Sequence, residues 1–349
     1  MNTEKENVIA HLDKELVSEV EHFKSLINSI KTQFDMFDSN NKSEQARNNY
    51  VEKSKDKIFD VVKKHFDKIW RKITTLDKNS YVVYRKYYQE ALLPFFGNSQ
   101  INSHIYNKPL GYAGDFIIMN YIYDYNDKYL GASSFEKLIN NLTCNIMISK
   151  SNLLRREYLK GIINAALEKK GKDVKIASIA SGPARELLDM LEAKRIPASI
   201  NVVCFDFEDK AFEYVMNKIN AIYGANAKTN IKLIKGNVVD IIRKKEVREK
   251  IAGQDLIYAF GIYDYLSDII AKKLTSALFE CLNPKGELIT CNASFVKSNM
   301  RAYYEFLGEW EMVYRTKEEM LKLTEGLDAS SVSIKDDEND CYIYTIIDK

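Results

Sequence analysis

The chain has 349 residues, with 51 Lys and Arg against 49 Asp and Glu, so its formal net charge is +2. That near-balance argues against a nucleic-acid binder, which needs a strongly basic face. Hydrophobic residues make up 46% and charged residues 29%, as in a globular protein with a full core. The low content of 14 Gly and 5 Pro excludes a collagen-like or Pro/Gly-rich disordered chain. The length allows two domains.

The five cysteines form no C-x-x-C pair, and their odd number argues against a disulfide framework or a zinc finger. Cys204, Cys291 and Cys341 lie in apolar runs, where cysteine is usually a small buried hydrophobe. The charged first residues lack the apolar core of a signal peptide, and no run of 18 apolar residues is present. We expect a cytoplasmic protein with no metal site and no membrane span.

The first ninety residues contain neither Gly nor Pro, and their periodicity predicts long helices. Over residues 9–37, two interleaved rows of apolar residues recur at a spacing of seven, as on one side of an amphipathic helix. Two further helices are predicted over 51–73 and 81–93, the last stopping at Pro94. The 9–37 stripe indicates packing inside a helical bundle, with a homodimer seam as the alternative. The stripe consists of Ile9, Leu16, Val20, Phe23, Ile27, Ile30, Phe34 and Phe37.

Short turn signals between Gly97 and Gly114 interrupt this helical half, ending in Lys108-Pro-Leu-Gly-Tyr-Ala-Gly-Asp115. Three more helices are predicted after them, over 117–124, 135–141 and 145–168. We therefore expect an all-α domain over 1–150 that contains a lid loop at 108–116.

After Gly171 the pattern changes to short apolar runs that alternate with helical segments. Such alternation is typical of βαβ units and a parallel sheet. The chain should end in an antiparallel hairpin, which completes a seven-stranded α/β sheet in a domain spanning 151–349. One helix follows the first strand and ends near Ala193, and two more helices are predicted over 209–223 and 271–282. The predicted strands are 175–179, 200–205, 230–235, 254–260, 287–291, 332–335 and 341–347.

The turn after the first of these strands is built from small residues. Such a turn lets the backbone pass close to a ligand, and the following helix offers free N–H groups. Pro183 is expected at the first helical position. The spacing is a degenerate G-x-G-x-x-G with alanines substituted, and a ligand-free tight turn is the alternative. The turn reads Ala180, Ser181, Gly182, Pro183, Ala184.

Polar residues also follow the second, third and fourth strands. Asp206 ends the second strand, where a carboxylate can accept both hydroxyls of a ribose, unless it or Asp209 only caps the next helix. Asn237 and Val238 follow the third strand, and the segment 260–265 follows the fourth. Ligands bind at the carboxyl ends of strands in open α/β sheets, so these residues form the candidate site.

Dinucleotides and S-adenosylmethionine both use such a site. Three features favour S-adenosylmethionine. The sheet lies in the C-terminal half, the loop lacks the third glycine that dinucleotide packing prefers, and Pro284-Lys-Gly286 precedes the fifth strand.

With these residues the chain resembles the class I S-adenosylmethionine-dependent methyltransferases, which have a Rossmann-like sheet. More narrowly, it is similar to bacterial methyltransferases assigned to the biosynthesis of 3-hydroxypalmitic acid methyl ester, an extracellular signalling factor. The resemblance runs from about Tyr81 to the end. It is carried by Lys108–Phe116 with Met119-Asn120, by Ser178–Leu187, by Asp255–Asp268 and by Trp310–Met320.

The resemblance implies roles for individual residues in binding the cofactor. The loop 180–184 would wrap the methionine portion of S-adenosylmethionine. Asp206 would hold the ribose, followed by Phe207 and by Glu208 as a second acid. Ser178 stands where the family often has an acid, and Asn237 replaces another. The implied cofactor-binding residues are Ala180, Ser181, Gly182, Pro183, Asp206, Phe207, Asn237, Val238, Phe260 and Gly261.

The resemblance also implies a reaction side. Tyr263 and Asp264 would line it together with Phe260 and Gly261, and Tyr112, Gly114 and Asp115 would belong to a loop that closes over it. The predicted catalytic set is Tyr112, Asp115, Tyr263 and Asp264.

Methyl transfer from a sulfonium is an in-line displacement, and a hydroxyl or amine acceptor often needs a base, whereas a carboxylate is already ionised. None of the four histidines, at 11, 22, 65 and 104, lies in the α/β half, which fits O-methylation of the carboxylate of a small hydrophobic acid such as a 3-hydroxy fatty acid. Arg155 or Arg156 could pair with the cofactor carboxylate. The alternatives are a protein side chain or another metabolite as acceptor, or a catalytically silent S-adenosylmethionine-binding protein.

Overall fold

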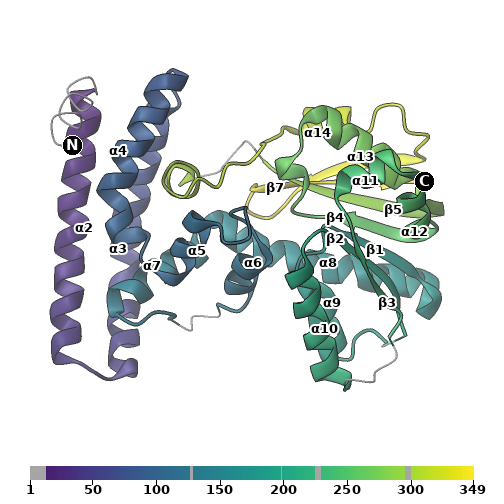
Figure 1. Ribbon diagram of the computed structural model, residues 1–349, viewed down its shortest axis with the longest axis horizontal. Coiled ribbons are helices and arrows are strands. Elements are labelled where there is room, and N and C mark those ends of the chain that lie inside the picture. The colour runs from purple at the N-terminus through teal and green to yellow at the C-terminus, as the bar shows by residue number, and fades with distance from the viewer. Residues whose placement is uncertain (1–12, 126–128, 198, 225–228, 295–299) are drawn as a thin grey trace. The chain divides into compact units, whose positions relative to one another are not determined.

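The computed structural model describes residues 13–125, 129–197, 199–224, 229–294 and 300–349 (Figure 1). Ile9 and His11 therefore lie outside the described residues. The described chain divides into two units. One consists of residues 13–150 and 300–311, and the other of residues 151–294 and 312–349, within the stated gaps.

The first unit is helical, and its long helices begin at capping residues. Asp13, Ser43 and Asp77 each accept a hydrogen bond from a backbone N–H of the following first turn, which satisfies a donor that has no partner inside the helix. The helices are α2 Lys14–Asn40, α3 Glu44–Ile73, α4 Lys78–Phe96, α5 Gln100–Asn107, α6 Phe116–Tyr123 and α7 Ser134–Asn145.

The apolar stripe of α2 packs inside this unit, against α3, α4 and α7. Phe23 stacks on His65 with ring centroids 3.6 Å apart, and Phe37 stacks on Tyr50 at 4.0 Å. For its described part, the prediction of bundle packing is confirmed. The buried members of the stripe are Leu16, Val20, Phe23, Ile27 and Phe34.

The prediction that the third helix stops at Pro94 is wrong, because α4 continues through this residue to Phe96. Proline near the end of a helix removes only one of its hydrogen bonds. Phe96 is buried and packs edge-on against Phe66 and Tyr303, which holds the last turn in place. Helix α5 was not predicted, since its eight residues lie between turn signals.

The second unit contains a seven-stranded sheet in the order β3-β2-β1-β4-β5-β7-β6. The first five of these strands are parallel, while β7 runs antiparallel to both β5 and β6. The predicted fold class, a Rossmann-like α/β sheet with a C-terminal antiparallel hairpin after an all-α part, is confirmed. The strands are β1 Lys175–Ile179, β2 Asn201–Asp206, β3 Ile231–Lys235, β4 Gln254–Ala259, β5 Leu282–Ala293, β6 Ser331–Asp336 and β7 Tyr342–Asp348.

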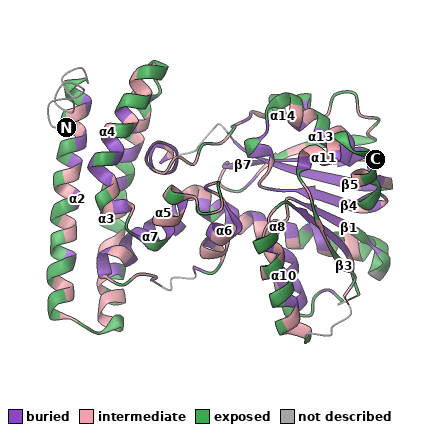
Figure 2. Cartoon of the chain, in the orientation of Figure 1, coloured by how far each residue is buried: buried purple, intermediate pink, exposed green. Residues whose placement is uncertain are grey.

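Helices lie on both faces of the sheet (Figure 1), and its central strands are buried (Figure 2). Apolar side chains of α11 Val238–Arg243, α13 Asp268–Glu280 and α14 Lys317–Lys322 pack on one face. The other face carries α8 Met147–Lys170, α9 Arg185–Glu192 and α10 Asp209–Tyr223, through contacts such as Tyr158 with Tyr344.

Two predicted boundaries in this unit are wrong. Strand β5 begins at Leu282, five residues earlier than predicted, and contains the expected Pro284–Gly286 turn. The pairing shifts between Gln254↔Leu282 and Leu256↔Glu287, an irregularity that tolerates proline. Helix α9 begins at Arg185, so Pro183 lies in the turn and is not the first helical residue.

The sequence also did not predict several short elements. They are α11, α12 Lys245–Lys250, α14 and a π-helix over Ala302–Leu307. The π-helix belongs to the helical unit, where all six of its residues are buried. All five cysteines are buried and free, which confirms the interpretation of Cys204, Cys291 and Cys341.

Candidate functional site

The turn between β1 and α9 adopts backbone conformations that normally select glycine. Ala180, Gly182 and Ala184 have φ values of 53°, 49° and 44°. Such left-handed conformations are unfavourable for residues with a Cβ atom. The degenerate motif therefore takes up the backbone path of a glycine-rich loop, although alanine occupies two of the three positions.

Asp206, at the carboxyl end of β2, is bonded to this turn. Its carboxylate accepts hydrogen bonds from the backbone N–H of Gly182 at 2.7 Å and of Glu208 at 3.0 Å. Burial raises the pKa of the Asp206 carboxyl, and these N–H donors oppose the rise. Glu208, and neither Asp206 nor Asp209, caps α10. The carboxylate thus ties two loops together, and the backbone N–H of Phe207 is a third donor to it.

The residues that follow Asp206 and β3 differ in how far their side chains are exposed. Phe207 follows it and is 48% exposed, which is unusual for a large aromatic side chain. Asn237 is exposed and caps α11 by accepting the N–H of Val239, while Val238 packs into the core. An added Cβ at Gly236 would lie 2.6 Å from the Phe205 ring, so this turn needs glycine.

Phe260 and Gly261 follow β4 at the same edge. Phe260 lies in a stack with Tyr344, whose ring centroid is 5.5 Å away, and with Tyr158 at 6.4 Å. Gly261 has a φ of 82°, and a Cβ there would lie 3.7 Å from the Arg155 guanidinium. Arg155 is buried and lies over the ring of Tyr342 at 4.7 Å. The structure thus brings one of the two predicted arginines to this edge.

Asp264 and Tyr263, the predicted reaction-side pair, have different surroundings. Asp264 is buried, and its Oδ1 accepts the N–H of Ala293 at 2.6 Å. Burial raises the pKa of the Asp264 carboxyl, and the charge of Arg155 opposes the rise. The ring of Tyr263 lies in the hydrophobic core, where its hydroxyl bonds to Thr275 Oγ1 at 2.9 Å. Asp264 therefore lies near the charged groups of this edge, whereas Tyr263 has core surroundings.

Sequence reasoning missed a buried acid beneath the loop. Glu186 of α9 accepts a hydrogen bond from the Tyr258 hydroxyl at 2.8 Å, and Tyr258 pairs in register with Ser178. Burial raises the pKa of the Glu186 carboxyl. Ser178 occupies the position of an expected acid, so Glu186 supplies a carboxylate close to that position from a different element.

Sequence reasoning also missed Arg315, which is 1% exposed. Its guanidinium donates to the carbonyls of Tyr263 at 2.9 Å and Leu266 at 2.6 Å, to Asn292 Oδ1 at 2.5 Å and to Asp268 Oδ1 at 3.0 Å. Arg315 thereby fixes the 263–268 loop, including the backbone of Asp264. The only sequence signal was its place within the Trp310–Met320 match.

The predicted loop 108–116 belongs to the helical unit, where Asp115 is fully buried and caps α6. Its Oδ1 accepts the N–H of Ile117 and Ile118, and its Oδ2 lies 2.7 Å from His104 Nε2. Tyr112 is partly buried. Asp115 thus both caps α6 and pairs with the His104 imidazole. The catalytic role of Tyr112 and Asp115 stays a prediction.

Two other features are absent from the described residues. They contain no group of three or more His, Cys, Asp or Glu side chains arranged to hold a metal ion. No helix among them is both long and apolar enough to cross a membrane.

No known family description and no curated protein matches the sequence. Among solved structures, the chain is similar to a possible exported protein from Bordetella parapertussis, with 16% identity, 75% of this chain and 87% of the other covered, and a TM-score of 0.55. At this identity the likeness shows a shared fold.

Two further solved structures are more distant. An O-methyltransferase family protein from Burkholderia thailandensis has 10% identity, coverage of 77% and 71%, and a TM-score of 0.45. The magnesium protoporphyrin IX methyltransferase of Synechocystis PCC 6803, solved with S-adenosylmethionine bound, has 10% identity, coverage of 58% and 84%, and a TM-score of 0.41.

Proposed function

We propose that this protein is an S-adenosylmethionine-dependent methyltransferase. The observation that carries the proposal is the set of groups at the carboxyl ends of β1, β2 and β4. There, a loop with left-handed backbone at three positions is tied to a buried carboxylate beside an exposed aromatic ring. A nucleoside with a ribose and a flat base fits such a set, because the carboxylate can accept hydroxyl protons and the ring can stack on the base.

The charges at this edge favour a cationic ligand over a dinucleotide. Glu186, Asp206 and Asp264 are buried acids whose pKa burial raises, and Arg155 is the buried base near Glu186 and Asp264. A sulfonium and an ammonium group would stabilise the ionised form of these acids, whereas a pyrophosphate would repel it. Arg155 would pair with the cofactor carboxylate.

For the acceptor we propose the carboxylate of a small hydrophobic acid such as a 3-hydroxy fatty acid, in a cytoplasmic enzyme. This finer assignment is supported by the resemblance of the sequence and by the absence of histidine from the α/β half of the chain. An ionised carboxylate needs no base, so the protein would mainly align the acceptor oxygen, methyl group and sulfur and exclude water. Tyr112, Asp115 and Asp264 are the residues that we propose to act in turnover.

A second candidate acceptor is a hydroxyl or an amine, and one observation favours it. The 2.7 Å pair of His104 Nε2 with Asp115 Oδ2 has the arrangement in which a carboxylate orients an imidazole that takes up a proton. Incubating cell extracts with the protein and labelled S-adenosylmethionine, followed by mass spectrometry of lipids, metabolites and proteins, separates the candidates. Label in no product would favour the silent binding protein.

Calorimetry tests the cofactor. We expect S-adenosylhomocysteine to bind and NAD not to bind. Asp206→Asn should weaken binding at least tenfold, since a hydrogen bond to a charged group contributes about 1.5–3 kcal/mol and tenfold corresponds to about 1.4 kcal/mol. The matched control is Asp209→Asn, which changes a neighbouring exposed carboxylate that pairs with Lys235. Equal affinity of all three proteins would mean that Asp206 only ties the loops together, and binding of NAD alone would overturn the proposal.

Turnover tests the reaction side. Tyr112→Phe and Asp264→Asn keep the size of each side chain, and the amide introduced by Asp264→Asn keeps an acceptor oxygen for the N–H of Ala293. We expect turnover to fall by more than tenfold in both variants while the melting temperature stays close to that of the wild type, and we expect Tyr112→Phe to leave the affinity for S-adenosylhomocysteine unchanged. Activity that falls only in step with the melting temperature would assign both residues a structural role.

A further inference from the structure

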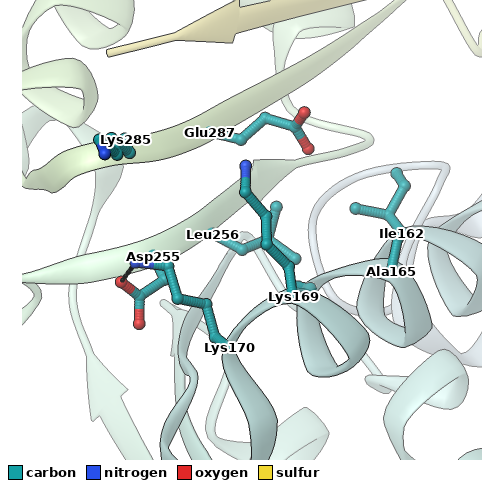
Figure 3. A pocket seen from close by; sticks show the side chains of 9 residues that line it. Ile162, Ala165, Lys169, Lys170, Asp255, Leu256, Lys285 and Glu287 are labelled. Carbon is teal, nitrogen blue, oxygen red and sulfur yellow. Dashed lines mark ion pairs between the residues drawn. The ribbon is translucent and has the colours of Figure 1, made fainter.

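A cavity of about 240 Å³ lies at the opposite edge of the sheet, between the end of α8 and the amino ends of β4 and β5 (Figure 3). Asp255, the second residue of β4, marks this edge, because its Oδ2 accepts the N–H of Lys175, the first residue of β1. Ligands of α/β sheets bind at the carboxyl ends, so this cavity is separate from the proposed cofactor site. The residues that line it are Ile162, Ala165, Ala166, Lys169, Lys170, Asp255, Leu256, Lys285 and Glu287.

The cavity has an apolar wall and a charged rim. Ile162, Ala165 and Ala166 of α8 form the apolar side together with Leu256 of β4. Its volume lies below the range of about 300–1,000 Å³ that is usual for drug-sized ligands. The cavity therefore suits a small molecule with a short apolar body.

The charged side chains on the rim differ in how many partners they have. Asp255 is engaged three times, by Lys170 at 3.5 Å, by Asn283 Nδ2 at 3.0 Å and by the N–H of Lys175 at 3.0 Å. In contrast, Lys169 and Lys285 form no ion pair or side-chain hydrogen bond with any described residue. Lys285 thus has no carboxylate partner in the described part of the chain, and Lys169 interacts with the Glu287 carboxylate only through its charge, beyond ion-pair distance.

Glu287 does not neutralise these lysines directly. It is partly buried, and within the described chain no cation comes into ion-pair distance of its carboxylate. Burial and the nearby Asp348 raise the pKa of the Glu287 carboxyl, and the charges of Lys169 and Lys335 oppose the rise. Figure 3 shows the Lys169 side chain extending toward Glu287 without an ion pair between them.

We propose that this cavity is a second binding site, which takes a small monocarboxylate with a short apolar chain. The carboxylate pairs with the ammonium groups of Lys169 and Lys285, and the chain lies against Ile162, Ala165 and Leu256. A ligand carboxylate provides an ion-pair partner for both lysines, and its apolar part covers the exposed side chain of Ala165. The site is independent of the proposed methyl transfer.

Binding of matched six-carbon probes tests the proposal. Hexanoate, hexanol and hexylamine share the chain and differ in the head group, and each is titrated into the full chain by calorimetry and by NMR. We expect hexanoate to bind at least tenfold more tightly than hexanol and hexylamine. Because the proposed methyl acceptor is also a carboxylic acid, each titration is repeated in saturating S-adenosylhomocysteine, and location is assigned by variants.

Three variants locate the probe. Lys169→Gln with Lys285→Gln removes both unpaired charges, and Ala165→Phe fills the apolar side of the cavity without changing charge. Both changes should weaken hexanoate at least tenfold, while Lys273→Gln, which removes an exposed lysine of α13, should leave it unchanged. Absence of hexanoate binding, equal binding of hexanol, or unchanged affinity in both cavity variants would overturn the proposal. Loss of S-adenosylhomocysteine binding would leave this proposal standing and contradict only the proposed function.

Discussion

A buried histidine of the helical unit and three buried carboxyl groups of the sheet unit have pKa values that burial shifts in opposite directions. In the helical unit, His65 is a buried base, and desolvation lowers its pKa from 6.5 to about 4. In the sheet unit, the buried groups at the carboxyl ends are acids, Glu186, Asp206 and Asp264, whose pKa values burial raises. Both shifts oppose charge in the interior.

The partners of these groups differ as well. His65 stacks between Phe23 and Tyr88 and bonds to Tyr88 and Glu19, all of which are side chains of the surrounding helices. The acids Asp206 and Asp264 bond mainly to backbone N–H groups of loops at the ends of strands. His65 is thus held by side chains in a packed core, whereas Asp206 and Asp264 hold the backbone of loops at the ends of strands.

The largest expected effect tests the loops of the sheet unit. Arg315→Met leaves the carbonyls of Tyr263 and Leu266 and Asn292 Oδ1 without their donor, at about 1–3 kcal/mol for each buried group. We expect a loss of more than about 3 kcal/mol in the free energy of unfolding, measured in urea. Asp268→Asn is the control and should lose less than about 1 kcal/mol, because the Asp268 side chain is 74% exposed. Similar losses in both variants would contradict the role of Arg315.

The second prediction concerns pH and the helical unit. The unfolded chain protonates His65 below about pH 6.5, whereas the folded protein resists protonation down to about pH 4. Folding stability should therefore fall as pH drops through this window, by about 3 kcal/mol from this residue, and should not depend on His65 above pH 7. The groups facing it are Glu19, Lys68, His22 and Tyr88.

His65→Gln measures this contribution, because it keeps a polar side chain that does not titrate. We expect the free energy of unfolding to change less between pH 7 and pH 4.5 in the variant than in the wild type. Glu19, whose pKa is lowered partly by His65, adds a loss in the same direction, so Glu19→Gln is measured alongside. Parallel pH curves for wild type and His65→Gln would show that His65 is not the neutral group proposed.

The third prediction has the opposite sign and concerns the sheet unit. The raised pKa of Glu186 means that the folded state holds its proton more strongly than the unfolded state. Its stabilising contribution is therefore present at low pH and is lost as pH rises through the folded value. Glu186→Gln keeps an oxygen for the Tyr258 hydroxyl, and it should be more stable than the wild type at pH 8, on the order of 1 kcal/mol, with no gain at pH 4. A gain that is independent of pH would contradict this account.

The smallest expected effect comes from replacing an alanine by glycine once in each unit. Ala184→Gly removes left-handed strain of about 1–2 kcal/mol and adds about 0.5–1 kcal/mol of unfolded-state entropy, so it should stabilise by less than about 1 kcal/mol. Ala46→Gly, inside α3, should instead destabilise by about 0.5–1 kcal/mol. Chemical denaturation measures both, and equal signs would contradict the conformation assigned to the 180–184 loop.

The sequence by itself determined the positions of the strands along the chain, the helical first half, the 180–184 turn and the position of Asp206. These features are readable because they are local: period-two and period-3.6 patterns, small residues in a turn and the end of an apolar run follow from a few neighbouring residues. Short elements and boundaries near Pro94, Pro183 and Pro284 were not readable, because packing and pairing elsewhere in the chain override the local preference of proline.

Only the tertiary structure decided which polar groups surround the candidate site. Glu186 meets Tyr258 across 72 positions of sequence, and Arg315 reaches the Tyr263 carbonyl across 52. It also assigned residues 300–311 to the helical unit, although the described segments before and after them in the sequence belong to the sheet unit. A buried charge is stable only when distant parts of the chain bring it a partner, and such partners leave no periodic signal in the sequence.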